Sequence, residues 1–144
     1  MNWAGNNWIF WALLSALFAA ATAILAKIGV AHVDSNLATA IRTTVVVLFA
    51  WTIALALGKH GEIRQVEPRA WLFLGLSGLA TGLSWLCYFR ALQLGPASRV
   101  APLDKLSVVL VIIFAALFLG EKLTPAAMIG GVLIAAGAVV MVIA

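Results

Sequence analysis

Five apolar segments, each roughly 20 residues long, fill almost all of this 144-residue sequence. A helix rises 1.5 Å per residue, so a segment of that length crosses a hydrocarbon core about 30 Å thick. Transmembrane strands would be about half as long and would alternate in polarity. The sequence therefore predicts an all-α integral membrane protein with five transmembrane helices, over residues 8–26, 37–57, 70–92, 100–119 and 125–144.

Composition supports this class, because 65% of the residues are hydrophobic and only 10% are charged. Soluble domains contain about 25% charged residues. We expect one transmembrane domain over residues 1–144, in the inner or plasma membrane, with no separate soluble domain. The net charge of +4 includes no dense basic run, so we expect no nucleic-acid partner. The start, MNWAGNNW, has no basic residue and does not resemble a signal peptide.

Three charged residues, Arg42, Asp104 and Lys105, lie inside the predicted spans. An ionised side chain there costs on the order of 3 kcal/mol, which favours a polar cavity within the membrane. Arg42 either snorkels to the headgroups or has a functional role. Lys105 is rotated by about 100° from Asp104 on a regular helix, so no simple salt bridge within the helix is expected. Arg42 and Asp104 lie at similar depth and either pair with each other or meet charged groups of a substrate.

Polar residues also form stripes along the spans. Ser77, Thr81, Ser84 and Tyr88 follow spacings of four, three and four, and so share one helical face. Such hydroxyls either line a cavity or bond to carbonyls of their own helix. The candidate cavity residues are Trp11, Ser15, Thr39, Arg42, Thr81, Ser84, Trp85, Tyr88, Asp104, Lys105 and Ser107.

Small residues at helical spacing let transmembrane helices approach closely. They predict packing faces on the third and fifth spans, formed by Gly75, Gly78, Gly82, Ala127, Gly131 and Ala135. Three tryptophans near the first span, Trp3, Trp8 and Trp11, are typical of an aromatic belt at the membrane interface.

Motifs for enzymatic chemistry are not found in the sequence. His32 and His60 fall in loops on opposite sides of the membrane, so they predict no shared metal site. No glycine-rich phosphate loop and no arrangement of serine, histidine and acid is recognisable. We therefore expect neither a cofactor nor a metal, and we do not expect an enzyme.

Basic residues are nearly balanced across the predicted membrane. On one side lie four basic residues, Lys59, Arg64, Arg69 and Lys122. On the other side lie three, Lys27, Arg90 and Arg99, or five when the embedded Arg42 and Lys105 are counted. The positive-inside rule needs an asymmetry to fix an orientation. Either the orientation is weakly determined or set by partners, or copies insert both ways and pair as antiparallel homodimers.

Several stretches resemble the EamA domain of the drug/metabolite transporter superfamily: Tyr88–Leu92 (YFRAL), Ala97–Leu103 (ASRVAPL), Leu119–Thr124 (LGEKLT) and Ile129–Gly137 (IGGVLIAAG). The resemblance implies a transporter of small metabolites, often an exporter of amino acids or related compounds. It also implies a five-helix unit whose first four helices line the cavity. Most members carry two such units in inverted orientation, so one unit resembles half a transporter and favours a homodimer with alternating access.

Two other functions stay open. One is multidrug efflux, the activity of the small multidrug-resistance relatives. Those relatives carry a glutamate in their first helix, whereas the first span here has no acidic residue. A non-transporting accessory or assembly subunit would instead use the glycine and alanine faces to bind another membrane protein.

Overall fold

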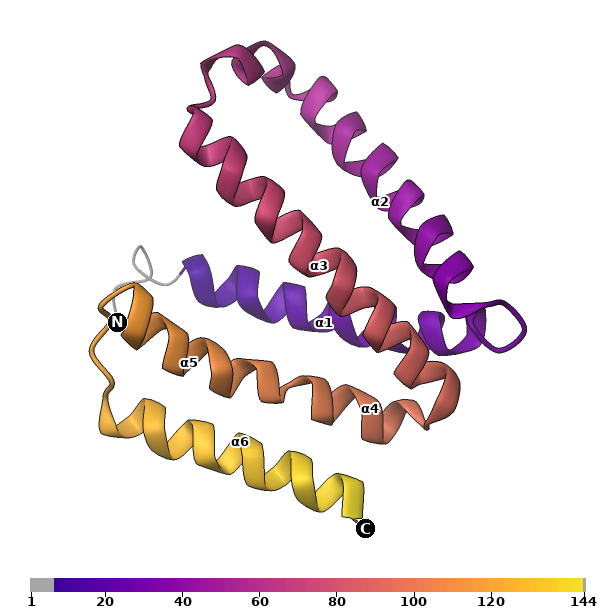
Figure 1. Ribbon diagram of the computed structural model, residues 1–144, viewed down its shortest axis with the longest axis vertical. Coiled ribbons are helices and arrows are strands. Elements are labelled where there is room, and N and C mark those ends of the chain that lie inside the picture. The colour runs from indigo at the N-terminus through magenta and orange to yellow at the C-terminus, as the bar shows by residue number, and fades with distance from the viewer. Residues whose placement is uncertain (1–6, 144) are drawn as a thin grey trace. The chain divides into compact units, whose positions relative to one another are not determined.

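The computed structural model describes residues 7–143, and every regular element in that range is helical (Figure 1). Five of its helical stretches are long and apolar enough to cross a membrane, as the sequence predicted. Trp3 and Ala144 lie outside the described residues. The elements are α1 (Asn7–Gly29), α2 (Ser35–Ala56), the 3-10 helix η2 (Lys59–Gln65), α3 (Pro68–Leu94), α4 (Ala97–Asp104), α5 (Leu106–Phe118) and α6 (Pro125–Ile143).

Side-chain caps fix where two of the helices begin. The Asp34 carboxylate accepts hydrogen bonds from the backbone N–H groups of Asn36 at 2.9 Å and Leu37 at 3.2 Å. A carboxylate at this position also interacts favourably with the helix dipole, so α2 starts two residues earlier than predicted. The Thr124 hydroxyl accepts from Ala127 N–H at 3.2 Å, and Pro125 occupies the first turn of α6, as expected.

The fourth span was predicted as one helix over residues 100–119. In the structure it divides at Lys105 into two helices, α4 and α5. Pro102 has no N–H group and therefore cannot bond to the carbonyl of Ser98. The backbone then tightens: Lys105 N–H bonds to the Pro102 carbonyl, and Val108 N–H bonds to the Lys105 carbonyl, each at 3.0 Å. These bonds reach back three residues, as in a 3-10 turn. The span therefore consists of two α-helical stretches joined by a tight turn at Lys105.

The chain forms two compact units, residues 29–93 and residues 1–28 with 94–144. In the second of these, α4 and α5 pack against α6. A methyl group added to Gly131 of α6 would lie 3.4 Å from Ile112 Cδ1, so the two helices approach closely there. In unit 29–93, Gln93 Nε2 donates to the Val33 carbonyl at 3.0 Å and ties the end of α3 to the segment before α2.

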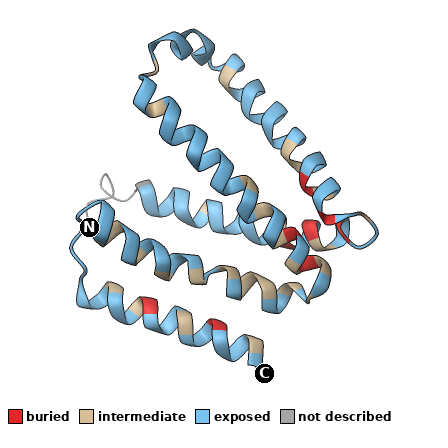
Figure 2. Cartoon of the chain, in the orientation of Figure 1, coloured by how far each residue is buried: buried red, intermediate tan, exposed pale blue. Residues whose placement is uncertain are grey.

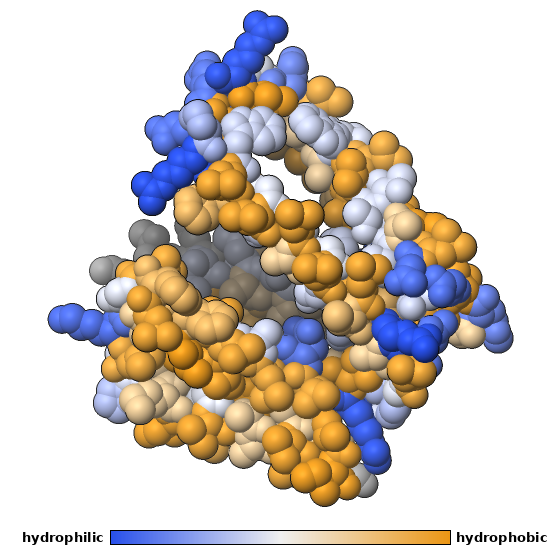
Figure 3. Space-filling view, in the orientation of Figure 1, coloured by the Kyte–Doolittle hydropathy of each residue, from blue (hydrophilic) through white to orange (hydrophobic). Residues whose placement is uncertain are grey.

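Most of the helical surface is exposed (Figure 2). Large apolar side chains such as Leu79 and Phe118 are 69% and 79% exposed. In Figure 3 the transmembrane helices are mainly orange, whereas the polar segment around η2 is mainly blue. A soluble monomer rarely exposes so much continuous apolar surface, and lipid is the solvent that suits it.

Candidate functional site

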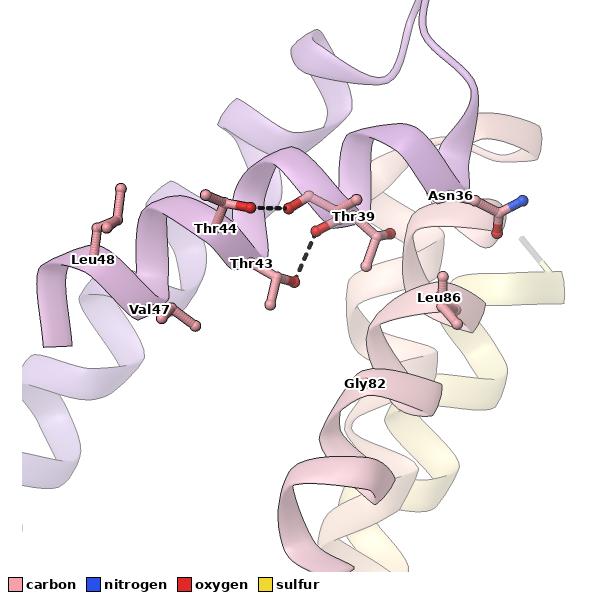
Figure 4. A pocket seen from close by; sticks show the side chains of 9 residues that line it. Asn36, Thr39, Thr43, Thr44, Val47, Leu48, Gly82 and Leu86 are labelled. Atoms are coloured by element: carbon pink, nitrogen blue, oxygen red, sulfur yellow. Dashed lines mark hydrogen bonds between the residues drawn. The ribbon is translucent and has the colours of Figure 1, made fainter. Parts of the chain in front are cut away.

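A pocket of about 420 Å³ lies between α2 and α3, within unit 29–93 (Figure 4). The pocket is a largely open groove and not an enclosed cavity, with a volume in the range of small-molecule sites, about 300–1,000 Å³. Its wall on α2 follows the three- and four-residue spacing of one helical face. The lining residues are Asn36, Thr39, Ala40, Thr43, Thr44, Val47, Leu48, Gly82 and Leu86.

The three threonines of the pocket direct their hydroxyl protons to their own helix. Thr39 Oγ1 donates to the Ser35 carbonyl at 2.8 Å, and Thr43 Oγ1 donates to the Thr39 carbonyl at the same distance. Thr44 Oγ1 donates to the Ala40 carbonyl at 3.0 Å (Figure 4). The hydroxyl oxygens still carry free lone pairs. The threonines therefore present hydrogen-bond acceptors and methyl groups to the pocket.

Arg42 links α2 to two aromatic side chains of α3. Its guanidinium carbon lies 4.0 Å from the ring centroid of Trp85 and 5.4 Å from that of Phe89, within the range of cation–π interactions. Along α2, Arg42 lies about 10 Å from the helix start at 1.5 Å per residue. Within residues 29–93 the guanidinium forms no hydrogen bond and no ion pair.

The predicted stripe on α3 is only partly enclosed. Trp85 and Tyr88 are half-buried, whereas Thr81 and Ser84 are exposed. Thr81 Oγ1 donates to the Ser77 carbonyl at 2.9 Å. Of the two roles predicted for these hydroxyls, Thr81 therefore shows the bond to a carbonyl of its own helix. A role of these residues in lining a cavity stays a prediction.

Trp11, Ser15 and Ser107 are exposed and belong to the other unit. The Trp11 ring meets that of Phe10 edge-on, with centroids 5.5 Å apart. A single cavity that combines these residues with Arg42 and Thr39 stays a prediction.

The expectation that Asp104 and Lys105 form no salt bridge was wrong, because Lys105 Nζ lies 3.4 Å from Asp104 Oδ2. The helix is interrupted at this point, and the long lysine side chain reaches back to the preceding carboxylate. Both side chains stay accessible, with 57% of Lys105 and 37% of Asp104 exposed. A pair between Arg42 and Asp104, which belong to different units, stays a prediction.

The glycines predicted for helix packing have different surroundings. Gly131 is buried against Ile112, and Ala127 and Ala135 of the same helix are half-buried. In α3, Gly82 lines the pocket, and a methyl group added at Gly75, Gly78 or Gly82 would meet no atom of unit 29–93 within 4 Å.

Several pocket residues were absent from the predicted site. Val47, Leu48 and Leu86 are apolar, so nothing distinguishes them from lipid-facing residues in the sequence. The signal available on α2 was the helical spacing from Asn36 through Thr43, which continues to Val47. Among the described residues, no group of three or more histidine, cysteine or acidic side chains is placed to hold a metal.

Comparison with known proteins decides the family. The sequence profile of the EamA-like transporter family matches residues 6–143. The chain belongs to the EamA-like transporter family. The same chain is 56% identical, over 138 residues, to a Sinorhizobium sp. protein named "Uncharacterized transporter in cobO 3'region". That alignment covers 96% of this chain and 98% of the relative. No solved structure matches the chain significantly.

Membership of this family makes the chain a membrane transporter and confirms the resemblance seen in the sequence. The five apolar helices and the polar groups among them are those of a multi-pass membrane protein. The α2–α3 pocket and Arg42 are the candidate site that the described residues carry best.

Proposed function

We propose that this EamA-like protein exports small metabolites, such as amino acids or related compounds, across the cell membrane as a homodimer. The observation that carries the proposal is charge within the spans of a transporter-family chain: Arg42 in α2 and the Asp104–Lys105 pair at the break between α4 and α5. Charges inside a membrane are costly and typically mark solute or ion paths. The proposed role involves no catalytic chemistry, in agreement with the family and the name of the relative.

A homodimer supplies the second five-helix unit that alternating access requires. Many transporters rock two inverted repeats about a central binding site. Residues 7–143 carry five candidate spans, and the Sinorhizobium relative aligns with this chain along 98% of its own length. Two antiparallel copies would form the inverted pair, and the weak asymmetry of basic residues supports insertion in both orientations.

The transport function is tested by solute flux in proteoliposomes that contain the purified full chain. A panel of amino acids and related metabolites is loaded inside, and efflux is compared with that from protein-free vesicles. Efflux of at least one solute above the background is the expected result. An absence of flux for the whole panel, together with stable co-purification of a larger membrane protein, would contradict transport.

Asp104→Asn tests the part played by the helix break. The substitution removes the carboxylate that pairs with Lys105 and leaves a cation in the span, so we expect flux to fall at least tenfold while insertion changes little. Lys122→Gln, in the connection before α6, is the matched charge-removing control. Wild-type flux by well-inserted Asp104→Asn would remove Asp104 from the mechanism.

A second function, as an accessory subunit, is favoured by one observation. Gly75 and Gly78 form a small-residue surface on α3, and within unit 29–93 a methyl group added at either position would meet no atom within 4 Å. Such a surface suits another transmembrane helix. Gly78→Leu separates the two functions when flux and self-association are measured together, because an accessory subunit should lose its larger partner, whereas a homodimeric carrier should retain flux as long as it still dimerises.

A further inference from the structure

Within unit 29–93, no acidic side chain pairs with the guanidinium of Arg42. Its contacts in this unit are with aromatic groups of α3, above all the Trp85 ring at 4.0 Å. A cation–π contact occupies no N–H donor of the guanidinium with a hydrogen bond, and these donors form a fork that matches an oxyanion. Arg42 is therefore held in place with its binding groups available.

The α2–α3 pocket adjoins this arginine. Thr39 and Thr43, which flank Arg42 on α2, both line the pocket. On α3, Gly82 and Leu86 line it on either side of Trp85 in the sequence. Neither Arg42 nor Trp85 lines the pocket itself, but each is next in the sequence to a lining residue, within the same unit.

The pocket wall defines what its ligand presents. Val47, Leu48 and Leu86 are apolar, and the threonine hydroxyls give their protons to α2 carbonyls. Such a wall suits an apolar group and supplies no hydroxyl proton to an anion. Among the lining residues, Asn36 offers amide N–H donors but no charge. Arg42, which lies beside the pocket, carries the positive charge that an anionic group would meet.

We propose that Arg42, held against Trp85, binds the oxyanion of a small carboxylate-bearing solute whose apolar part occupies the α2–α3 pocket. The inference rests on the proposed function, since the bound solute is taken to be the transported one. An oxyanion could come from a free solute or from a lipid headgroup phosphate, and the two sources share the same fork geometry.

The test uses equilibrium binding to the purified full chain in dodecyl maltoside and phosphate-free buffer, measured by isothermal titration calorimetry. The probes are phenylacetate and its neutral isostere phenylacetamide. A charge-assisted hydrogen bond should make phenylacetate bind on the order of tenfold more tightly. Equal affinities, or no binding of either probe, would overturn the inference.

Variants assign that preference to Arg42. Arg42→Gln should bind both probes equally, and Arg42→Lys should keep part of the preference because it retains the charge without the planar fork. Arg90→Gln is the matched control, since Arg90 is exposed and its guanidinium donates to Gln93 Oε1 at 2.8 Å. Undiminished binding of phenylacetamide shows that a variant is folded. A preference that survives in Arg42→Gln would overturn the inference.

A lipid arm separates the two sources of the oxyanion. Short-chain dihexanoylphosphatidylglycerol replaces phenylacetate in the same titrations. Binding of this lipid that depends on Arg42, without preferential binding of phenylacetate, would make Arg42 a headgroup anchor and overturn the solute site. Binding as proposed without flux in proteoliposomes would contradict only the transport function, whereas flux without the carboxylate preference would contradict only this inference.

Discussion

At the scale of single residues, Arg42 shows how a charge is tolerated within an apolar helix. A desolvated cation over an aromatic ring gains about 2 kcal/mol, which offsets most of the roughly 3 kcal/mol cost of an ionised group on insertion scales. Trp85 and Phe89 supply this stabilisation without neutralising the charge. The arrangement keeps a cation inside the span and available to an anion.

Gly120 is a second position where one residue determines local structure. Its φ of 68° ends α5 in the left-handed region and allows Glu121 N–H to bond to the Ala115 carbonyl at 3.2 Å. Gly120→Ala should lower the free energy of unfolding by about 1–2 kcal/mol, because a Cβ atom is strained in this conformation. Titration with SDS in mixed micelles measures the change.

The control for Gly120→Ala is Gly137→Ala in the middle of α6. An added methyl group there meets no atom of the described chain within 4 Å, and alanine favours a helix by up to about 1 kcal/mol. Gly137→Ala should therefore leave stability unchanged or raise it. Equal destabilisation by the two variants would contradict the role given to the left-handed turn.

At the scale of elements, the break between α4 and α5 is the feature that most distinguishes one span from the others. A 3-10 turn within a helix often marks a functional hinge or a sequence under strain. Here the turn follows Pro102 and coincides with Asp104 and Lys105, two of the three charged residues between Ala97 and Phe118. Polarity and the change of helical hydrogen bonding therefore fall at the same place in this span.

Close packing of α5 and α6 depends on Gly131. A methyl group at this position would make an ordinary contact with Ile112, whereas a larger side chain would overlap it. Gly131→Ala should change the free energy of unfolding by less than about 0.5 kcal/mol, and Gly131→Leu should lower it by about 1–3 kcal/mol. Gly137→Leu, on the exposed surface of α6, is the matched control. Similar losses for both leucine variants, in the same SDS titration, would argue against the α5–α6 contact.

The positions of the spans could be predicted from sequence because lipid requires every backbone polar group to bond within its own helix, which gives long apolar runs. The interruption at Lys105 was missed although Pro102 was visible, because the stretch from Ala97 to Phe118 as a whole is still apolar enough to cross a membrane as one helix. The stacking of Arg42 on Trp85 was also missed. Both residues were candidates, but their contact depends on how α2 and α3 meet and not on spacing along either helix.

At the scale of the whole molecule, a carrier needs two states that expose its site to opposite sides of the membrane. In our proposal two antiparallel copies provide them, so each copy contributes one Arg42 and one Asp104–Lys105 pair to the assembly. The nearly balanced basic residues then have a function, because a strong bias would force all copies into one orientation.

The antiparallel arrangement is tested most directly by the side from which a cysteine in the η2 segment can be labelled. Gln65→Cys is made in a Cys87→Ser background, since Gln65 and the free Cys87 are both exposed. His32→Cys, in the connection predicted for the opposite side, is the matched control. We predict that an impermeant maleimide labels roughly half of each protein in intact cells and the remainder only after permeabilisation. Labelling of Gln65→Cys from one side only, with His32→Cys labelled only from the other, would contradict the antiparallel homodimer.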